Sequence, residues 1–188
     1  CVEVVCGKRR IVLDMGTGLR PLGNSLFPEM LKNNGLDIVF LLSHVHWDHI
    51  QGLPFFGPLY VNKSVARNRF TFYGGLDWQR SAEICFRGQM DPPVFPVSWG
   101  EITKTVESIN FETVYDRMSF ALWDDPSQNG FVPVPSREDW SRDSSRNHLV
   151  IITCGKLNHP NETYGWVIEY RGKKFVFTTD NEPFDPKC

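Results

Sequence analysis

The length, composition and charge of the chain fit one compact enzyme domain. Its 188 residues are 41% hydrophobic and 13% aromatic, which is ample for a single core and excludes a disordered chain. The formal net charge of −2 argues against a broadly basic nucleic-acid-binding surface. Because no apolar stretch approaches the roughly 20 residues that cross a bilayer, and no signal-peptide pattern opens the chain, we expect a protein that is not embedded in a membrane.

The N-terminal part predicts a β-hairpin, a helix and a buried strand. Residues 2–5 and 10–13 are strand-like, and residues 6–9 between them are typical of a turn. Four apolar residues then follow helical spacing, namely Leu19, Leu22, Leu26 and Met30. Pro21 suits the start of this helix and Gly35 the position after its end. Residues 37–43 are an apolar run of strand length.

The second half predicts one more helix and several strands. A helix is expected over residues 76–90, with Trp78, Ala82, Cys85 and Phe86 on one face, and residues 111–120 are expected to be extended. Residues 124–147 are polar and predict a long surface insertion, not a second domain. A strand is expected over residues 148–153. Residues 165–170 and 174–178 predict a closing hairpin.

The cysteines argue against both a disulfide framework and a zinc ribbon. The five are scattered, their number is odd, and none forms a Cys-x-x-Cys pair: Cys1, Cys6, Cys85, Cys154 and Cys188. Reduced thiols in a cytoplasmic protein are the simplest interpretation. We expect Cys154 to be a small buried hydrophobe, and not a ligand.

The most informative segment is the run His44-x-His46-x-Asp48-His49, directly after the apolar strand. Neutral imidazole and carboxylate are ligands that zinc, iron and manganese accept. His44 and His46 can reach one ion, while Asp48 and His49 can reach a second. Without a cation, packing these groups together would bury uncompensated polar atoms. The run therefore predicts a two-metal site. For His148, a structural role is the preferred interpretation.

Together with three other segments, this run resembles the metallo-β-lactamase superfamily. Residues 11–18 are similar to its early strand, which ends in an Asp-x-Gly-x-Gly turn at Asp14. Residues 157–165 resemble the segment that bears a later histidine ligand, here His159, and residues 175–180 resemble the strand that delivers a metal-bridging aspartate, here Asp180. The sequences Leu-Asn-His-Pro (residues 157–160) and Thr-Asp-Asn-Glu (residues 179–182) most resemble the phosphodiesterase and ribonuclease Z-like branch.

The resemblance implies a fold and a set of ligands. The fold would be a single four-layer αββα sandwich over residues 1–188, with the metals at one edge between the two sheets. One ion would be held by His44, His46 and His159. The other would be held by Asp48, His49 and Asp180, with Asp180 bridging both ions and Asp14 orienting the histidines. The family's last histidine ligand has no counterpart in residues 181–188, so we interpret the sequence as the central part of a longer polypeptide.

The resemblance and the ligand types together predict a binuclear metal-dependent hydrolase. A water between two dications, zinc first and manganese or iron as alternatives, has its pKa pulled towards neutral and supplies a bridging hydroxide. Asp48 and Asp180 are the catalytic candidates. The preferred substrate is a small phosphodiester or nucleotide. Asn161 and Thr163 can reach a phosphate oxygen of it, with an ordinary turn role for Pro160-Asn161 as the equal alternative, and Trp47 is among the aromatic residues that can stack on a base. A homodimer is left open.

Two alternative functions remain. The same centre serves hydrolases of lactam, lactone or thioester bonds, since fold does not settle function. A diiron centre that binds or reduces oxygen or nitric oxide is the non-hydrolytic alternative. Elemental analysis separates the iron alternative from the hydrolases.

Overall fold

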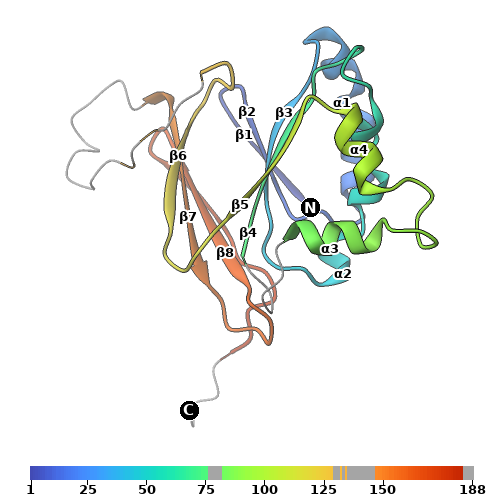
Figure 1. Cartoon of the computed structure of the whole chain (residues 1–188). Coiled ribbons are helices and arrows are strands. Elements are labelled where there is room, and N and C mark those ends of the chain that lie inside the picture. The colour runs from blue at the N-terminus through green and yellow to red at the C-terminus, as the bar shows by residue number, and fades with distance from the viewer. Residues whose placement is uncertain (76–81, 129–131, 133, 135–146, 184–188) are drawn as a thin grey trace.

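Two β-sheets pack face to face, and helices cover the outer face of one of them (Figure 1). The computed structural model describes residues 1–75, 82–128, 132, 134 and 147–183. The first sheet has the order β1-β2-β3-β4-β5, and the second has the order β6-β7-β8-β9. Among the described residues, no helix is both long enough and apolar enough to span a membrane.

The strands of the two sheets follow one another along the chain, with the helices between strands of the first sheet. The strands of the first sheet are β1 (Val2–Cys6), β2 (Arg9–Leu13), β3 (Asp37–Leu41), β4 (Arg69–Gly74) and β5 (Ser108–Thr113). Those of the second sheet are β6 (Ser119–Trp123), β7 (Leu149–Lys156), β8 (Tyr164–Tyr170) and β9 (Lys173–Phe177). The helices are α1 (Leu19–Lys32), α2 (Trp47–Ile50), α3 (Ala82–Gln89) and α4 (Trp99–Thr105), with 3-10 turns η1 (Leu53–Phe55) and η2 (Gly57–Tyr60).

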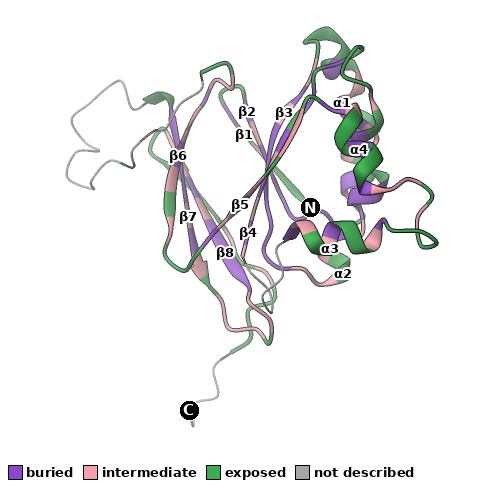
Figure 2. Ribbon diagram, viewed as in Figure 1, coloured by how far each residue is buried: buried purple, intermediate pink, exposed green. Residues whose placement is uncertain are grey.

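The side chains of β3 explain why its sequence is apolar from Ile38 to Leu41. Ile38 and Phe40 belong to the core between the first sheet and the helices. Val39 and Leu41 belong to the core between the two sheets. Because successive side chains of a strand point to opposite faces, a strand covered on both sides must be apolar at every position. Figure 2 shows β3 as largely buried, with exposed residues on the outer sides of the helices.

The layers confirm the predicted sandwich. The helical layer, the first sheet and the second sheet are three of the four layers of an αββα fold (Figure 1). Within the described ranges, no helix covers the outer face of the second sheet.

Both predicted hairpins and the first helix are confirmed. β1 and β2 pair antiparallel, and Gly7 in their turn has a φ of 63°, which glycine adopts readily. α1 buries Leu19, Leu26 and Met30. β8 and β9 pair through the two-residue turn Arg171–Gly172, where both φ angles are positive (49° and 72°), as a tight hairpin requires.

The prediction of one extended segment over residues 111–120 is wrong. β5 ends at Thr113 and β6 begins at Ser119, and the two strands belong to different sheets. A turn between them contains Arg117 with a φ of 62° and a hydrogen bond from Met118 N to Tyr115 O of 3.0 Å. The break carries the chain from one sheet to the other.

Two other predictions are tested only in part. α3 confirms the second half of the helix expected over residues 76–90, with Ala82 and Phe86 buried. Residues 76–81, including Trp78, lie outside the described residues, as does most of the predicted insertion over residues 124–147. The sequence reading missed β4 and α4, although Ser98 and Glu101 form a capping box that marks the start of α4.

Candidate metal centre

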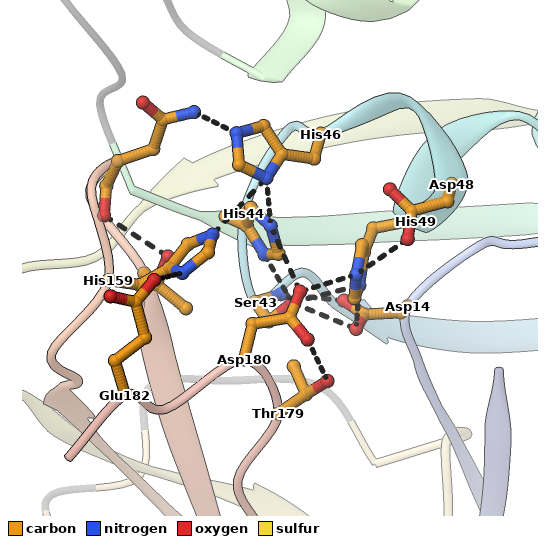
Figure 3. Close-up of polar contacts among 12 residues, drawn as sticks. Asp14, Ser43, His44, His46, Asp48, His49, His159, Thr179, Asp180 and Glu182 are labelled. Atoms are coloured by element: carbon orange, nitrogen blue, oxygen red, sulfur yellow. Dashed lines mark hydrogen bonds and ion pairs between the residues drawn. The ribbon is translucent and has the colours of Figure 1, made fainter.

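The predicted ligands are delivered by the ends of strands from both sheets (Figure 3). β2 and β3 are parallel neighbours, so the residues that follow them meet at the same edge of the first sheet. Asp14 directly follows β2, and residues 43–49, here called the histidine loop, follow β3. The backbone of Met15 joins the two segments, donating from N to His49 O at 2.7 Å.

The second sheet brings its residues to the same edge. His159 lies in the loop between β7 and β8, and Asp180 lies just beyond β9. Tyr164 N, at the start of β8, donates to Ser43 O at 2.9 Å. The indole of the fully buried Trp166 donates to Leu42 O at 3.3 Å. These bonds fix the β8 end against the histidine loop.

Three imidazoles form a first donor group, His44, His46 and His159. Nε2 of His44 lies 2.8 Å from Nδ1 of His46, and Nε2 of His159 lies 3.3 Å from that same Nδ1. Around a tetrahedral zinc with bonds of 2.0–2.1 Å, neighbouring nitrogens are about 3.3 Å apart. The spacing of the three nitrogens therefore fits one small cation.

A second donor group consists of His44, His49 and Asp180. Oδ2 of Asp180 lies 2.9 Å from Nε2 of His49 and 3.5 Å from Nε2 of His44. In each group all donor atoms lie within 4.8 Å of one another. The two groups share His44, so they are adjacent halves of one centre.

Hydrogen bonds behind the rings set the tautomers of His44 and His49. A carboxylate only accepts, so His49 Nδ1 donates to Oδ2 of Asp14 at 2.8 Å. The Ser43 hydroxyl donates to the same carboxylate at 2.8 Å. This leaves its oxygen to accept from His44 Nδ1 at 3.1 Å. In both rings the unprotonated Nε2 then faces the donor groups, as metal ligation requires.

Glu182 performs the same task for His159. Nδ1 of His159 donates to Oε1 of Glu182 at 3.1 Å, which leaves Nε2 free to face His46. The backbone reinforces this pair, since Glu182 N donates to Asn158 O at 2.7 Å and Asn158 N donates to Asn181 Oδ1 at 3.1 Å. The segment that carries Asp180 is thereby joined to the loop that carries His159.

Sequence reasoning missed Glu182 and Ser43. Glu182 follows the predicted ligand Asp180 by two positions, which was the available signal. Its partner His159 is 23 residues away in the chain, so the contact could not be read from local sequence. For Ser43, its place immediately before the first ligand was the available signal.

The electrostatics of the centre favour neutral His44. Burial, followed by the neighbouring charges of His49 and His46, lowers the pKa of His44 to about 4. The hydrogen bond to Asp14 and the charges of Asp14, Asp48 and Asp180 raise the pKa of His49, against its burial. Neutral His44 has a free lone pair at pH 7, which is the form that binds a metal.

The donor set as a whole fits a divalent cation. Three unprotonated nitrogens that face one another within hydrogen-bond range repel one another through their lone pairs unless a cation or a proton lies between them. Nitrogen-rich sets with one carboxylate are typical of zinc. The ions would be held by the residues of the two donor groups, namely His44, His46, His49, His159 and Asp180.

Asp48 lies beside these groups and not within them. Its side chain is 72% exposed, and Oδ2 is 3.4 Å from Nε2 of His49. Asn161, expected to contact substrate, instead lies against Nε2 of His46. Rotating the side-chain amide of Asn161 by half a turn places its Oδ1 beside Nε2 of His46, where it can accept the proton of that nitrogen. Thr163 is buried, and its hydroxyl donates to the Asn161 carbonyl at 3.1 Å.

His148 and Cys154 belong to neither donor group. Nδ1 of His148 is 3.2 Å from Oδ2 of Asp124. Cys154 is buried, and its thiol donates to Tyr115 O at 3.1 Å. The burial of Cys154 is as expected.

The sequence matches the beta-lactamase superfamily domain over residues 9–188. No curated protein matches the sequence. Among solved structures the chain is similar to Zn(2+)-bound PqqB from Methylobacterium extorquens, with 17% identity, a TM-score of 0.47, and coverage of 93% of this chain and 46% of that chain. It is also similar to human tRNase Z, short form (ELAC1), with 18% identity, a TM-score of 0.45, and coverage of 93% and 59%. The chain therefore spans less than two thirds of the length of either protein.

Proposed function

The chain belongs to the metallo-β-lactamase superfamily, as its sequence predicts, and we propose that it is a two-metal hydrolase of phosphodiester bonds. The single observation that carries the proposal is the pair of donor groups that share His44, one with three imidazoles and one with Asp180. A pair of adjacent groups suits two ions a few ångströms apart. The sequences Leu-Asn-His-Pro and Thr-Asp-Asn-Glu support assignment to the phosphodiesterase and ribonuclease Z-like branch.

The chemistry of such a centre suits a phosphodiester. Two divalent ions bound here, zinc being the preferred metal, would lower the pKa of a shared water and stabilise the attacking and leaving oxygens of an in-line displacement. Asp180 belongs to the second donor group and lies 3.5 Å from Nε2 of His44, which both groups share, so we propose it as the bridging carboxylate. Asp14 and Ser43 hold the rings of His49 and His44 so that each Nε2 faces the ions.

Two exposed residues, Asp48 and Trp47, lie beside the metal ligands in the histidine loop. Asp48 is exposed in the first turn of α2. Its position lets its carboxylate turn towards an ion at His49. Trp47 is 68% exposed and directly follows the ligand His46 in the chain, so its indole is available to contact the organic part of a substrate. We propose a small phosphodiester or nucleotide as the substrate of this open site.

Metal content and substrate range test the proposal together. Protein dialysed against zinc is analysed for metal per chain and assayed with bis(p-nitrophenyl) phosphate, a lactam, a lactone and a thioester. We expect two zinc ions and preferential hydrolysis of the phosphodiester. Hydrolysis of a lactam, lactone or thioester in preference would replace the phosphodiester assignment and leave the metal centre intact. Two irons in protein purified without added metal would favour the oxygen or nitric oxide alternative.

The variant His46→Ala, with His148→Ala as its control, tests the site itself. Both histidines are partnered to polar neighbours, but only His46 belongs to a donor group. We expect His46→Ala to abolish metal-dependent turnover in a folded protein, and His148→Ala to keep it. Unchanged turnover in metal-loaded His46→Ala would contradict the site assignment.

A further inference from the structure

A cavity of about 580 Å³ lies at the far end of the first sheet from the metal centre. Asp37 and Arg69, which line it, are the first residues of β3 and β4, whereas the histidine loop follows the last residue of β3. At about 3.3 Å per residue, the path from Asp37 to His44 is roughly 20 Å long. β3 runs between the two places (Figure 1), so the cavity is separate from the metal centre.

The carboxylates around this cavity are already neutralised. Glu29 accepts from Arg10 at 2.6 Å. Asp37 accepts from the buried Arg9 at 2.7 Å, and Asp125 accepts from Lys8 at 2.7 Å. Each of the three acidic groups is therefore paired with a cation, while Arg10 also pairs with Glu3 and the charge of Arg69 also acts on Asp37.

Two arginines of the lining, Arg67 and Arg69, have no ion-pair partner among the described residues. Arg67 lies two residues before β4 and Arg69 is the first residue of β4, and both line the same cavity. Their backbone is fixed, because Arg67 N donates to Asn34 O at 2.9 Å and Arg69 N donates to Leu36 O at 2.8 Å. Two exposed guanidinium groups thus line one cavity, and neither forms an ion pair with a carboxylate of the described residues.

We infer that this cavity, here called the arginine pocket, binds the phosphate group of a small phosphorylated molecule. The guanidinium fork pairs with phosphate oxygens through two parallel hydrogen bonds, and two arginines match the double charge of a phosphate monoester. The volume of the pocket falls within the roughly 300–1,000 Å³ typical of small-ligand sites. Leu36 and Val5 in the lining supply apolar surface for the organic part of a ligand the size of a mononucleotide.

The inference is independent of the proposed hydrolase activity and is tested by locating bound anions. The full chain, labelled with ¹⁵N, is titrated with AMP and separately with inorganic phosphate, with and without bound zinc. We expect the amide signals of Gly35, Arg67 and Arg69 to shift in both metal states. Shifts confined to the histidine loop of the zinc-loaded protein would mean that the anion binds at the metals, and would overturn the inference. The absence of any shift at millimolar ligand would do the same.

Matched double variants separate a built site from a diffuse positive field. Arg67→Gln with Arg69→Gln removes both forks, while Arg20→Gln with Lys104→Gln removes two exposed charges that do not line the pocket. We expect the dissociation constant for AMP to rise at least about tenfold in the first pair only, as loss of a charge-assisted pair implies. Equal weakening in both pairs would assign the binding to overall charge and contradict the pocket.

Lysine substitutions examine the role of the fork, and the hydrolysis assay provides an internal control. Arg67→Lys with Arg69→Lys keeps the charge and loses the planar donors, so AMP binding should weaken by an intermediate factor. If it stays at the wild-type value, the guanidinium geometry has no role. Metal content and phosphodiester hydrolysis should remain unchanged in all three double variants, so a failure of this inference is distinct from a failure of the hydrolase proposal.

Discussion

Asp14 and Asp180, which come from different sheets, contact opposite nitrogens of one imidazole. Asp14 lies 2.8 Å from Nδ1 of His49, and Asp180 lies 2.9 Å from Nε2 (Figure 3). Both aspartates have left-handed backbone conformations, with φ of 56° and 49°. Aspartate is among the few residues that adopt this region, and such strain is found where surrounding structure holds a functional side chain in place.

Replacing Asp14 should weaken metal binding without removing a ligand. In Asp14→Ala the His49 ring loses the acceptor that fixes its tautomer, and Ser43 loses the acceptor of its hydroxyl proton. We expect zinc affinity to fall by about 10- to 100-fold, as for other residues that orient metal-bound histidines. Competition with a zinc chelator measures the change, and Asp91→Ala, at an exposed carboxylate away from both donor groups, is the control. Wild-type affinity in Asp14→Ala would contradict the orienting role.

Glu182 should contribute to metal binding through His159. In Glu182→Gln the side-chain oxygen still accepts from Nδ1 but without its charge, whereas Glu182→Ala removes the acceptor. We expect zinc affinity to decrease in the order wild type, Gln, Ala, with the Ala variant about 10- to 100-fold weaker. Imidazole ¹⁵N shifts should show that the Nδ1-protonated form of His159 is less populated in Glu182→Ala. An unchanged tautomer ratio would show that Glu182 does not set the ring.

Asp180 and Asp48 should differ in how many ions they retain. Asp180→Ala removes a carboxylate that contacts both His49 and the shared His44, so we expect lower occupancy of both ions. Asp48→Ala removes a carboxylate that contacts only the His49 side, so we expect one ion to remain. Both variants should lose hydrolysis. Metal analysis after dialysis decides: two ions retained in Asp180→Ala would contradict a bridging role.

Gly52 should tolerate no side chain. A Cβ there would overlap the carbonyl oxygen of Gly16 and lie 2.8 Å from that of Met15. The backbone cannot withdraw easily, because Gly52 N donates to Met15 O at 2.7 Å. We expect Gly52→Ala to lower the free energy of unfolding by at least about 2 kcal/mol. Denaturant titration measures this, with Gly155→Ala as the control, since nothing lies within 4 Å of a Cβ there. A change below about 0.5 kcal/mol, typical of neutral surface sites, would show that the two turns can separate.

Local patterns were sufficient to predict the hairpins, the first helix and the histidine loop. Arg171–Gly172 between two apolar strands, for example, needs no distant partner to form a tight turn. The break at Arg117 could not be predicted in this way, because the two strands that it separates pair with neighbours far away in the chain. β4 was missed although its buried residues alternate from Phe70 to Gly74, a signal that was available.

The site shows the same division. The spacing of His44, His46 and His49 predicted that they would converge, since they lie within six positions after one strand. The contact of Glu182 with His159 depends on how β9 leaves its sheet, and no local pattern reports that. The grouping of His44 with His49 and Asp180, and the place of Asp48 beside this group, likewise depend on distances between segments.

The sharing of His44 by the two donor groups has a consequence for metal loading. The Nε2 atom of His44 has one lone pair, so it can bind only one ion at a time. An ion that takes His44 together with His46 and His159 leaves His49 and Asp180 for its neighbour, with Asp48 near enough to join them. The two ions would therefore bind with unequal strength, and loading would proceed in two steps. At limiting zinc, a population with one ion per chain would come before the binuclear state.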